Sequence, residues 1–159
     1  MSKYNLKSSI KAKKGIKIAI AISQYNTDIT SALLESSRNE LVSRGVSDKN
    51  ISITEAPGAF ELPFVCQKLA DSTKYDAIIA LGAIIKGETP HFDFIASAVA
   101  QGIMDIGLKY KTPVIFGVLT TNNLKQAKDR IKGGIIGDKG VEAALAALKM
   151  TNSQLITHN

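Results

Sequence analysis

The sequence has little of several residue types on which common protein chemistries depend. Its 159 residues include one cysteine and two histidines, and no tryptophan. A single cysteine cannot form an internal disulfide, so we expect a reducing compartment. Cys66 lies in an apolar stretch, which favours a buried structural thiol. Two histidines and one cysteine cannot assemble a convincing zinc site, so no metal is expected.

Several long segments and motifs are absent as well. No run of about 18 apolar residues is present, so no transmembrane helix is predicted. No apolar signal core precedes Gly15, and we therefore expect a cytoplasmic protein. The sequence contains no GxxxxGK[ST] loop, no GxGxxG after a predicted strand and no GxSxG elbow. The nucleotide-binding and serine-hydrolase signatures are thus missing.

The charge is unbalanced and positive. The formal net charge is +6, and the isoelectric point is about 9.4. This excess is a weak indication of an anionic partner, and nucleic acid is one candidate. However, no motif of interleaved basic and aromatic residues supports nucleic-acid binding. Lysine outnumbers arginine 17 to 3, so an arginine in a loop hints that its planar guanidinium is needed there.

Strand and helix patterns alternate along most of the chain. Runs of β-branched and apolar residues predict strands at residues 16–22, 51–55, 76–85 and 113–119. Helical spacing predicts helices at residues 28–44, 60–70, 92–110, 124–130 and 141–150. This alternation predicts an α/β fold: a three-layer α/β/α domain with a four-stranded parallel sheet, of flavodoxin-like architecture. The domain is expected over residues 15–150, between an arm (1–14) and a polar tail (151–159).

In open α/β sheets, ligands bind beyond the carboxyl ends of the strands, so the segments after each strand are the ones to search. Tyr25 follows the first strand, and its ring either stacks on a planar ligand or packs at the edge of the core. Glu61 follows the second strand in a turn that opens a helix. Its carboxylate is either a helix-start charge or a ligand contact.

The segment after the third strand is the richest in polar residues. Gly87 allows a ligand to approach the backbone, and free amides at the helix entry near Thr89 and Pro90 suit a phosphate. His91 follows, and it is either a proton-transfer group or a surface histidine. These residues together predict a domain that binds a phosphate and a flat polar ligand.

Two residues near the fourth strand remain open. Phe116 lies within this strand, where a core role is the default. Arg130 ends the next predicted helix, just before a glycine-rich loop. It either holds an oxyanion through its guanidinium fork or is a solvent-exposed helix end.

Three segments resemble the signature segments of lumazine synthases, in the same order and at the same spacing. They read PGAFELP (57–63), LGAIIKGETPHFD (81–93) and PVIFGVLTT (113–121). The resemblance extends over residues 15–150. It implies condensation of 5-amino-6-(D-ribitylamino)uracil with 3,4-dihydroxy-2-butanone 4-phosphate to 6,7-dimethyl-8-ribityllumazine, phosphate and water, the penultimate step of riboflavin biosynthesis. No metal or organic cofactor is implied.

The resemblance also implies roles for individual residues. His91 matches the proton donor. The pyrimidine-binding positions are Tyr25, Ala59, Phe60, Glu61, Ala83, Ile84, Ile85 and Phe116. Among these, Tyr25 matches a stacking ring, Glu61 faces the ribityl hydroxyls, and Phe116 matches a ring lent to a neighbouring subunit. The sugar-phosphate-binding positions are Glu88, Thr89 and Arg130.

Assembly is a further implication of the resemblance. It implies pentamers, which either stand alone or build a hollow icosahedral capsid of about sixty subunits. Active sites would then lie between adjacent subunits, and the arm would pair with a neighbour's sheet. Riboflavin synthase is an implied protein partner, and no nucleic-acid or membrane partner is implied.

The sequence departs from the family pattern at four places. Tyr25 stands where phenylalanine or tryptophan is more common, and Glu88 and Pro90 stand where smaller or hydroxylated residues are common. The stretch between Arg130 and Lys139 looks one residue longer, which leaves the register of that loop and the role of Lys139 open. A non-catalytic flavin- or phosphate-binding module of flavodoxin-like architecture is the main alternative function.

Overall fold

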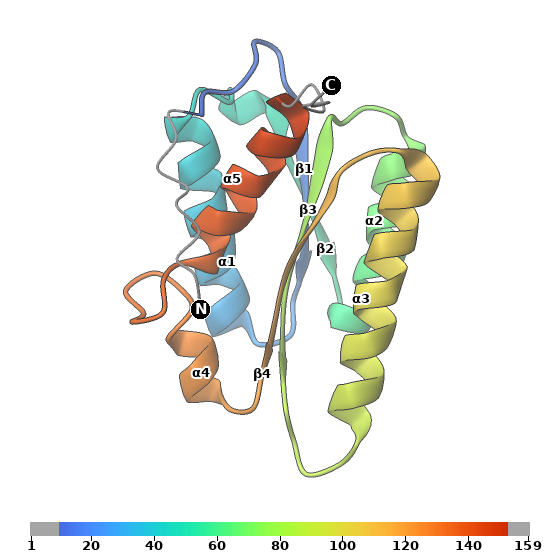
Figure 1. Ribbon diagram of the computed structural model, residues 1–159, viewed down its shortest axis with the longest axis vertical. Helices are drawn as coiled ribbons and strands as arrows, with labels where there is room; N and C mark the ends of the chain where they lie inside the picture. The colour runs from blue at the N-terminus through green and yellow to red at the C-terminus, as the bar shows by residue number, and fades with distance from the viewer. Residues whose placement is uncertain (1–9, 153–159) are drawn as a thin grey trace, which may run out of the picture.

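The computed structural model describes residues 10–152, and it places helices on both faces of one sheet (Figure 1). The strands are β1 (Ile18–Ser23), β2 (Ile51–Ala56), β3 (Ala77–Ile85) and β4 (Val114–Thr121). The helices are α1 (Thr27–Ser43), α2 (Leu62–Asp71), α3 (His91–Tyr110), α4 (Leu124–Lys128) and α5 (Lys139–Asn152). Two short 3-10 turns, η1 (Asp48–Asn50) and η2 (Ala59–Glu61), precede β2 and α2.

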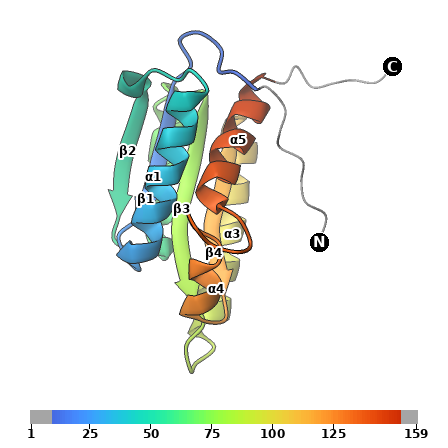
Figure 2. The same cartoon turned by 90° about the vertical axis from the view of Figure 1, so that its left-hand side faces the viewer.

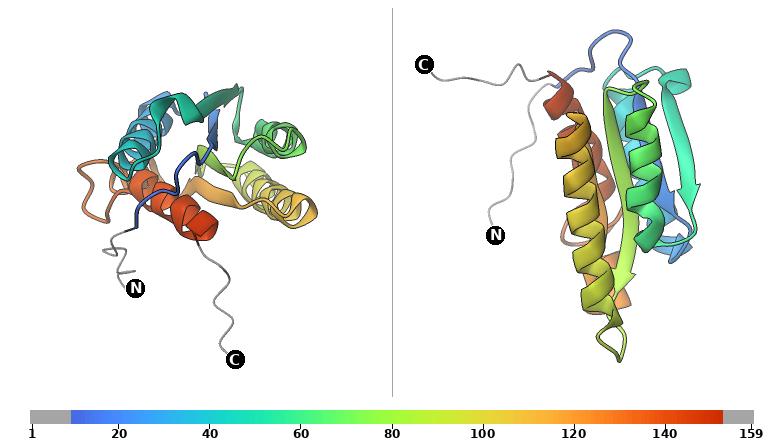
Figure 3. Two further views of the ribbon diagram at one scale, coloured as in Figure 1. Left: turned by 90° about the horizontal axis from the view of Figure 1, so that it is seen from above. Right: turned by 90° about the vertical axis from the view of Figure 1, so that its right-hand side faces the viewer.

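The four strands are parallel and follow the order β2-β1-β3-β4. Figure 2 shows this order across the sheet, and Figure 3 shows the helices as layers on its two sides. Helices α1, α4 and α5 cover one face, whereas α2 and α3 cover the other. The predicted three-layer α/β/α fold with a four-stranded parallel sheet is therefore confirmed.

Side-chain alternation along the central strands builds a separate core on each face. In β1, Ile18 and Ile20 pack with α1 and α5, whereas Ala19 and Ala21 face α2 and α3. All four side chains are fully buried. Burial of each isoleucine contributes about 1.5–3 kcal/mol to folding. Both faces of the central strands are apolar because both faces are covered.

The predicted element boundaries differ from the structure by a few residues at most. Helix α2 begins two residues later than predicted, because the turn η2 precedes it and Pro63 then falls in its first turn. Helix α5 begins two residues earlier than predicted, at Lys139. Helix α4 ends at Lys128, so Arg130 lies in the loop that follows. Helical spacing predicts Val42 on the apolar face of α1 with Ile29 and Leu33, yet Val42 is exposed whereas the other two are buried. Within residues 10–152, no helix is long and apolar enough to cross a bilayer.

The two ends of the chain lie largely outside the described residues. Residues 1–9 of the arm and residues 153–159 of the tail are not described. The last residues of the arm contact their own chain, because the Ala12 amide donates to the Arg44 carbonyl oxygen (2.8 Å). Pairing of the arm with a neighbouring sheet remains a prediction.

Candidate functional site

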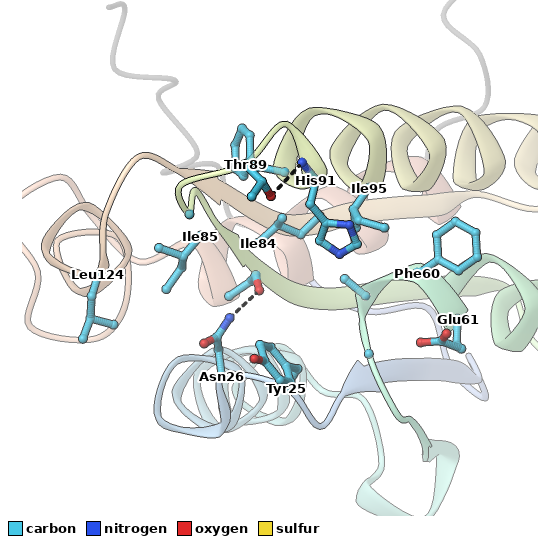
Figure 4. A pocket seen from close by; sticks show the side chains of 15 residues that line it. Tyr25, Asn26, Phe60, Glu61, Ile84, Ile85, Thr89, His91, Ile95 and Leu124 are labelled. Carbon is cyan, nitrogen blue, oxygen red and sulfur yellow. Dashed lines mark hydrogen bonds between the residues drawn. The ribbon is translucent and has the colours of Figure 1, made fainter.

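A cavity of about 580 Å³ lies where the carboxyl ends of the strands meet the start of α3 (Figure 4). We call it the imidazole cavity, because the ring of His91 points into it. Its walls come from three loops and the first turns of α3. The lining residues are Tyr25, Asn26, Gly58, Ala59, Phe60, Glu61, Ala83, Ile84, Ile85, Gly87, Thr89, His91, Phe92, Ile95 and Leu124.

The β1–α1 loop supplies an aromatic wall. Tyr25 is 71% exposed, so its ring does not pack at the edge of the core in the single chain. Its amide donates to the Ser23 hydroxyl oxygen at 3.2 Å. Tyr25 thus presents a ring and a hydroxyl to the cavity, as a stacking residue would.

The turn between β2 and α2 supplies a second wall and a carboxylate. Ala59 is buried, whereas the Phe60 and Glu61 side chains are exposed. A β-carbon at Gly58 would lie 3.0 Å from the Oε2 atom of Glu61. The glycine therefore leaves the space that the Glu61 carboxylate occupies, although its own backbone (φ −143°) is open to any residue.

The end of β3 forms the floor of the cavity. On the side that faces β1, the backbone groups at this end of β3 pair with no strand. Pairing of β1 with β3 ends at Ile22 and Leu81, whereas β3 continues to Ile85. In a regular strand, alternate residues direct their backbone groups to the same side. The Ala83 carbonyl accepts a hydrogen bond from the β1 side, so the backbone groups of Ile85 are also directed there. The polar edge of a planar heterocycle could form hydrogen bonds with these unpaired backbone groups.

The loop between β3 and α3 has free amides. Within residues 10–152, the amides of Gly87, Glu88 and Thr89 donate no hydrogen bond to another protein group. A β-carbon at Gly87 would meet no atom within 4 Å, so nothing in the chain itself requires glycine there. That space is open to a ligand, and free amides are suitable donors to a phosphate.

His91 is the first residue of α3 and follows Pro90, which lies just before the helix rather than at its first position. Its amide approaches the Thr89 hydroxyl oxygen at 3.4 Å. The imidazole projects from the helix start across the cavity, toward the side where Tyr25 and Glu61 lie (Figure 4). The ring is exposed, so it is accessible to a ligand and can exchange protons with it.

The described residues that line the imidazole cavity offer no lysine or arginine to accompany the free amides of residues 87–89. Among these described lining residues, Glu61 is the one carboxylate. Cys66 cannot serve as a nucleophile nearby, because burial raises the pKa of its thiol to about 12. Within the described chain, no three histidine, cysteine or acidic side chains gather as metal ligands would.

A second cavity, of about 370 Å³, lies along the outer side of β4, the last strand of the described sheet. We call it the arginine cavity. Arg130 and Lys139 line it together with Phe116, whose ring is 44% exposed. The Arg130 guanidinium donates to the Gln126 carbonyl oxygen (2.8 Å). The Lys139 ammonium pairs with Glu142 (2.6 Å).

The structure divides the predicted site residues between these two cavities. No described residue lines both cavities. Phe116 and Arg130 line the arginine cavity. Glu88 lines neither, although its neighbours Gly87 and Thr89 line the imidazole cavity. The other nine line the imidazole cavity, namely Tyr25, Ala59, Phe60, Glu61, Ala83, Ile84, Ile85, Thr89 and His91.

Besides Gly87, five further residues of the imidazole cavity are not among the predicted site residues. They are Asn26, Gly58, Phe92, Ile95 and Leu124. Phe92 and Ile95 follow His91 by one and four residues along α3, so helical spacing could have indicated Ile95. Leu124 could not have been found in this way, because only the fold brings the start of α4 to the end of β3.

Comparisons with known proteins agree with this geometry. A sequence model of the 6,7-dimethyl-8-ribityllumazine synthase family matches residues 15–154. A 6,7-dimethyl-8-ribityllumazine synthase of Parabacteroides distasonis is 43% identical to this chain over 152 residues. That alignment covers 96% of this chain and 94% of the relative. The chain therefore belongs to the 6,7-dimethyl-8-ribityllumazine synthase family.

Proposed function

We propose that the protein condenses 5-amino-6-(D-ribitylamino)uracil with 3,4-dihydroxy-2-butanone 4-phosphate. The products are 6,7-dimethyl-8-ribityllumazine, phosphate and water, and the step is the penultimate one of riboflavin biosynthesis. The observation that carries the proposal is the imidazole of His91, which points into a cavity walled by Tyr25 and floored by an open strand edge. Membership of the family supports the same reaction.

The walls of the imidazole cavity suit the pyrimidine substrate. Its flat ring would stack on Tyr25, and its polar edge would bind the backbone of residues 83–85. The ribityl hydroxyls would donate to the Glu61 carboxylate and meet the η2 turn at Ala59 and Phe60. These contacts leave the two amino groups of the pyrimidine on the side of the cavity that His91 faces.

The reaction needs a group that both gives and accepts protons. An amine attacks the ketone and loses water to form an imine, phosphate is eliminated, and the second amine attacks the carbonyl that results and closes the ring with loss of a second water. His91 would transfer protons in these steps, since imidazole exchanges protons near neutral pH. Much of the remaining acceleration would come from holding the two substrates together.

The phosphate group needs more than the imidazole cavity provides. The amides of Gly87, Glu88 and Thr89 are free to bind it, but no lysine or arginine lines that cavity within the described chain. The arginine cavity has Arg130, whose guanidinium matches phosphate geometry. We propose that two subunits complete one site: one brings the imidazole cavity, and its neighbour brings Arg130 and Phe116.

Exposed apolar side chains support self-association. Four large side chains on α2 and α3 are exposed: Phe64, Phe94, Met104 and Leu108. On a monomer these side chains would remain in water, whereas a subunit contact would bury them. We propose pentamers, alone or assembled into a sixty-subunit icosahedral shell, and light scattering of the purified protein distinguishes the two.

The remaining proposals concern the arm, the partner and the location. The outer edge of β2 is open in the described sheet, so residues 1–14 of a neighbouring chain could add a strand there. We propose riboflavin synthase as the protein partner and the cytoplasm as the location, since a lone buried cysteine suits a reducing compartment.

Mixing both substrates with the purified protein tests the proposed reaction. We expect lumazine absorbance and inorganic phosphate to appear together. A flavin- or phosphate-binding module would bind ligand without turnover, so binding without either product would refute the proposal.

A further inference from the structure

Asn26 has an unusual conformation for the residue that opens a helix. Its backbone is left-handed, with φ 58° and ψ 50°. Its carbonyl oxygen accepts the first hydrogen bonds of α1, from Ile29 (2.9 Å) and Thr30 (3.0 Å). Asparagine at this position commonly caps the helix through its side chain, but the Asn26 side chain makes no such bond.

The Asn26 side chain is instead directed at β3. Its Nδ2 atom donates a hydrogen bond to the carbonyl oxygen of Ala83 at 2.8 Å (Figure 4). Ala83 is buried and lies two residues beyond Leu81, the last residue of β3 that pairs with β1. The amide group of Asn26 therefore satisfies a buried carbonyl for which β1 offers no partner, and leaving such a group unpaired is costly.

This bond joins two walls of the imidazole cavity. Asn26 follows Tyr25 in the chain, and Ala83 begins the floor that continues to Ile85. A planar ring that stacks on Tyr25 and binds β3 through its edge must fit the distance between the Tyr25 ring and the backbone of residues 83–85. The Asn26–Ala83 bond fixes this separation before any ligand arrives.

We propose that Asn26 is a positioning residue for the pyrimidine substrate. It holds the Tyr25 ring at the correct distance from the β3 edge, and acts on the ligand through these two groups. This inference rests on the proposed function, since the ligand whose ring fills the gap is the pyrimidine. It predicts that loss of the bond weakens pyrimidine binding and spares the sugar-phosphate end.

Two substitutions separate this role from a purely structural one. Asn26→Asp keeps the size of the side chain but replaces the donor by a carboxylate, which repels the Ala83 carbonyl. An acidic residue at the start of α1 is favourable for the helix and offsets part of the cost of the unpaired Ala83 carbonyl, so we expect the variant to fold with a lowered melting temperature. Asn26→Gly removes the bond without adding charge and accepts the left-handed backbone without strain. The matched control is Asn39→Asp, with the same charge change at an exposed position of α1.

The measurement is titration of each variant with 5-amino-6-(D-ribitylamino)uracil alone, followed by steady-state kinetics with both substrates. We expect the Kd for the pyrimidine to rise about tenfold or more in both Asn26 variants, because binding must then order the two walls that the bond otherwise holds in place. The KM for the sugar phosphate should stay within about twofold of wild type. Asn39→Asp should match wild type in both values.

The possible outcomes separate this inference from the proposed reaction. If the wild-type protein forms no lumazine, the proposed function fails. If it forms lumazine but either Asn26 variant binds the pyrimidine as tightly as wild type, the positioning role is overturned. An equal loss of affinity for both substrates would also overturn it, since that is the signature of general unfolding around the cavity.

Discussion

The imidazole cavity and the arginine cavity are both partly apolar hollows beside the same sheet, but they carry different polar groups. The first has His91, a carboxylate and free backbone amides, and no lysine or arginine among its described lining residues. The second has Arg130 and Lys139 beside an exposed Phe116 ring, and no histidine among its described lining residues. One cavity is equipped for proton transfer and ring binding, and the other for an anion.

Neither cavity alone carries all the groups that we assign to the proposed reaction. We propose that the sugar phosphate reacts beside the His91 imidazole of one cavity while its phosphate binds Arg130 of the other. If one copy's imidazole cavity faces the arginine cavity of a second copy, the shared site has both a proton-transfer group and a cation for the phosphate. We therefore propose that activity depends on assembly of the subunits.

The largest expected effect is on the imidazole side. His91→Ala should lower kcat about 10²–10⁴-fold, because general acid–base catalysis contributes about that much. The Kd for the pyrimidine should remain close to that of wild type, since Tyr25, Glu61 and the β3 edge are unchanged. Stopped-flow absorbance and a binding titration give the two values. Unchanged turnover would remove His91 from the chemistry.

A smaller effect is expected on the arginine side. Arg130→Ala should raise the KM for the sugar phosphate about tenfold to a hundredfold, the range for a hydrogen bond to a charged group. Arg130→Lys should recover part of the loss, because it restores charge without the planar fork. Lys128→Ala removes the same charge from an exposed residue nearby and is the control. Equal effects of Lys128→Ala and Arg130→Ala would indicate general electrostatics instead of a phosphate contact.

The smallest effect is expected within the imidazole cavity itself. Gly58→Ala places a methyl group 3.0 Å from the Glu61 carboxylate, which must move, while the backbone at residue 58 stays unstrained. We expect the Kd for the pyrimidine to rise about twofold to tenfold, as for one weakened hydrogen bond. The melting temperature should not change. A lower melting temperature with unchanged affinity would show that Gly58 serves the fold and not the ligand.

Much of the fold could be predicted because it follows from local patterns. The central strands are apolar on both faces, as in residues 77–85, and this pattern belongs to a sheet covered by helices on both sides. Several residues of the imidazole cavity could also be predicted, because the carboxyl ends of parallel strands meet at one edge of the sheet. The loops that follow three strands therefore bring Tyr25, Glu61 and His91 into one cavity.

The parts that could not be predicted depend on long-range geometry. Nothing near Asn26 in the sequence indicates that its side chain binds a carbonyl 57 residues away, because asparagine before a helix is usually explained as a cap. Spacing also could not place Arg130 and Phe116 in a separate cavity, since only the position of β4 at the sheet edge puts them there.

The most direct test of a site shared between subunits is complementation between two impaired variants, assayed at a sugar-phosphate concentration well below the KM of Arg130→Ala. His91→Ala and Arg130→Ala chains are co-expressed in equal amounts, and the mixed assemblies are compared with each variant alone. In a randomly mixed ring, about one quarter of the interfaces join an intact His91 to an intact Arg130. The account predicts that lumazine formation returns to about that fraction of the wild-type rate. Mixed assemblies no more active than the separate variants would contradict a site built from two chains.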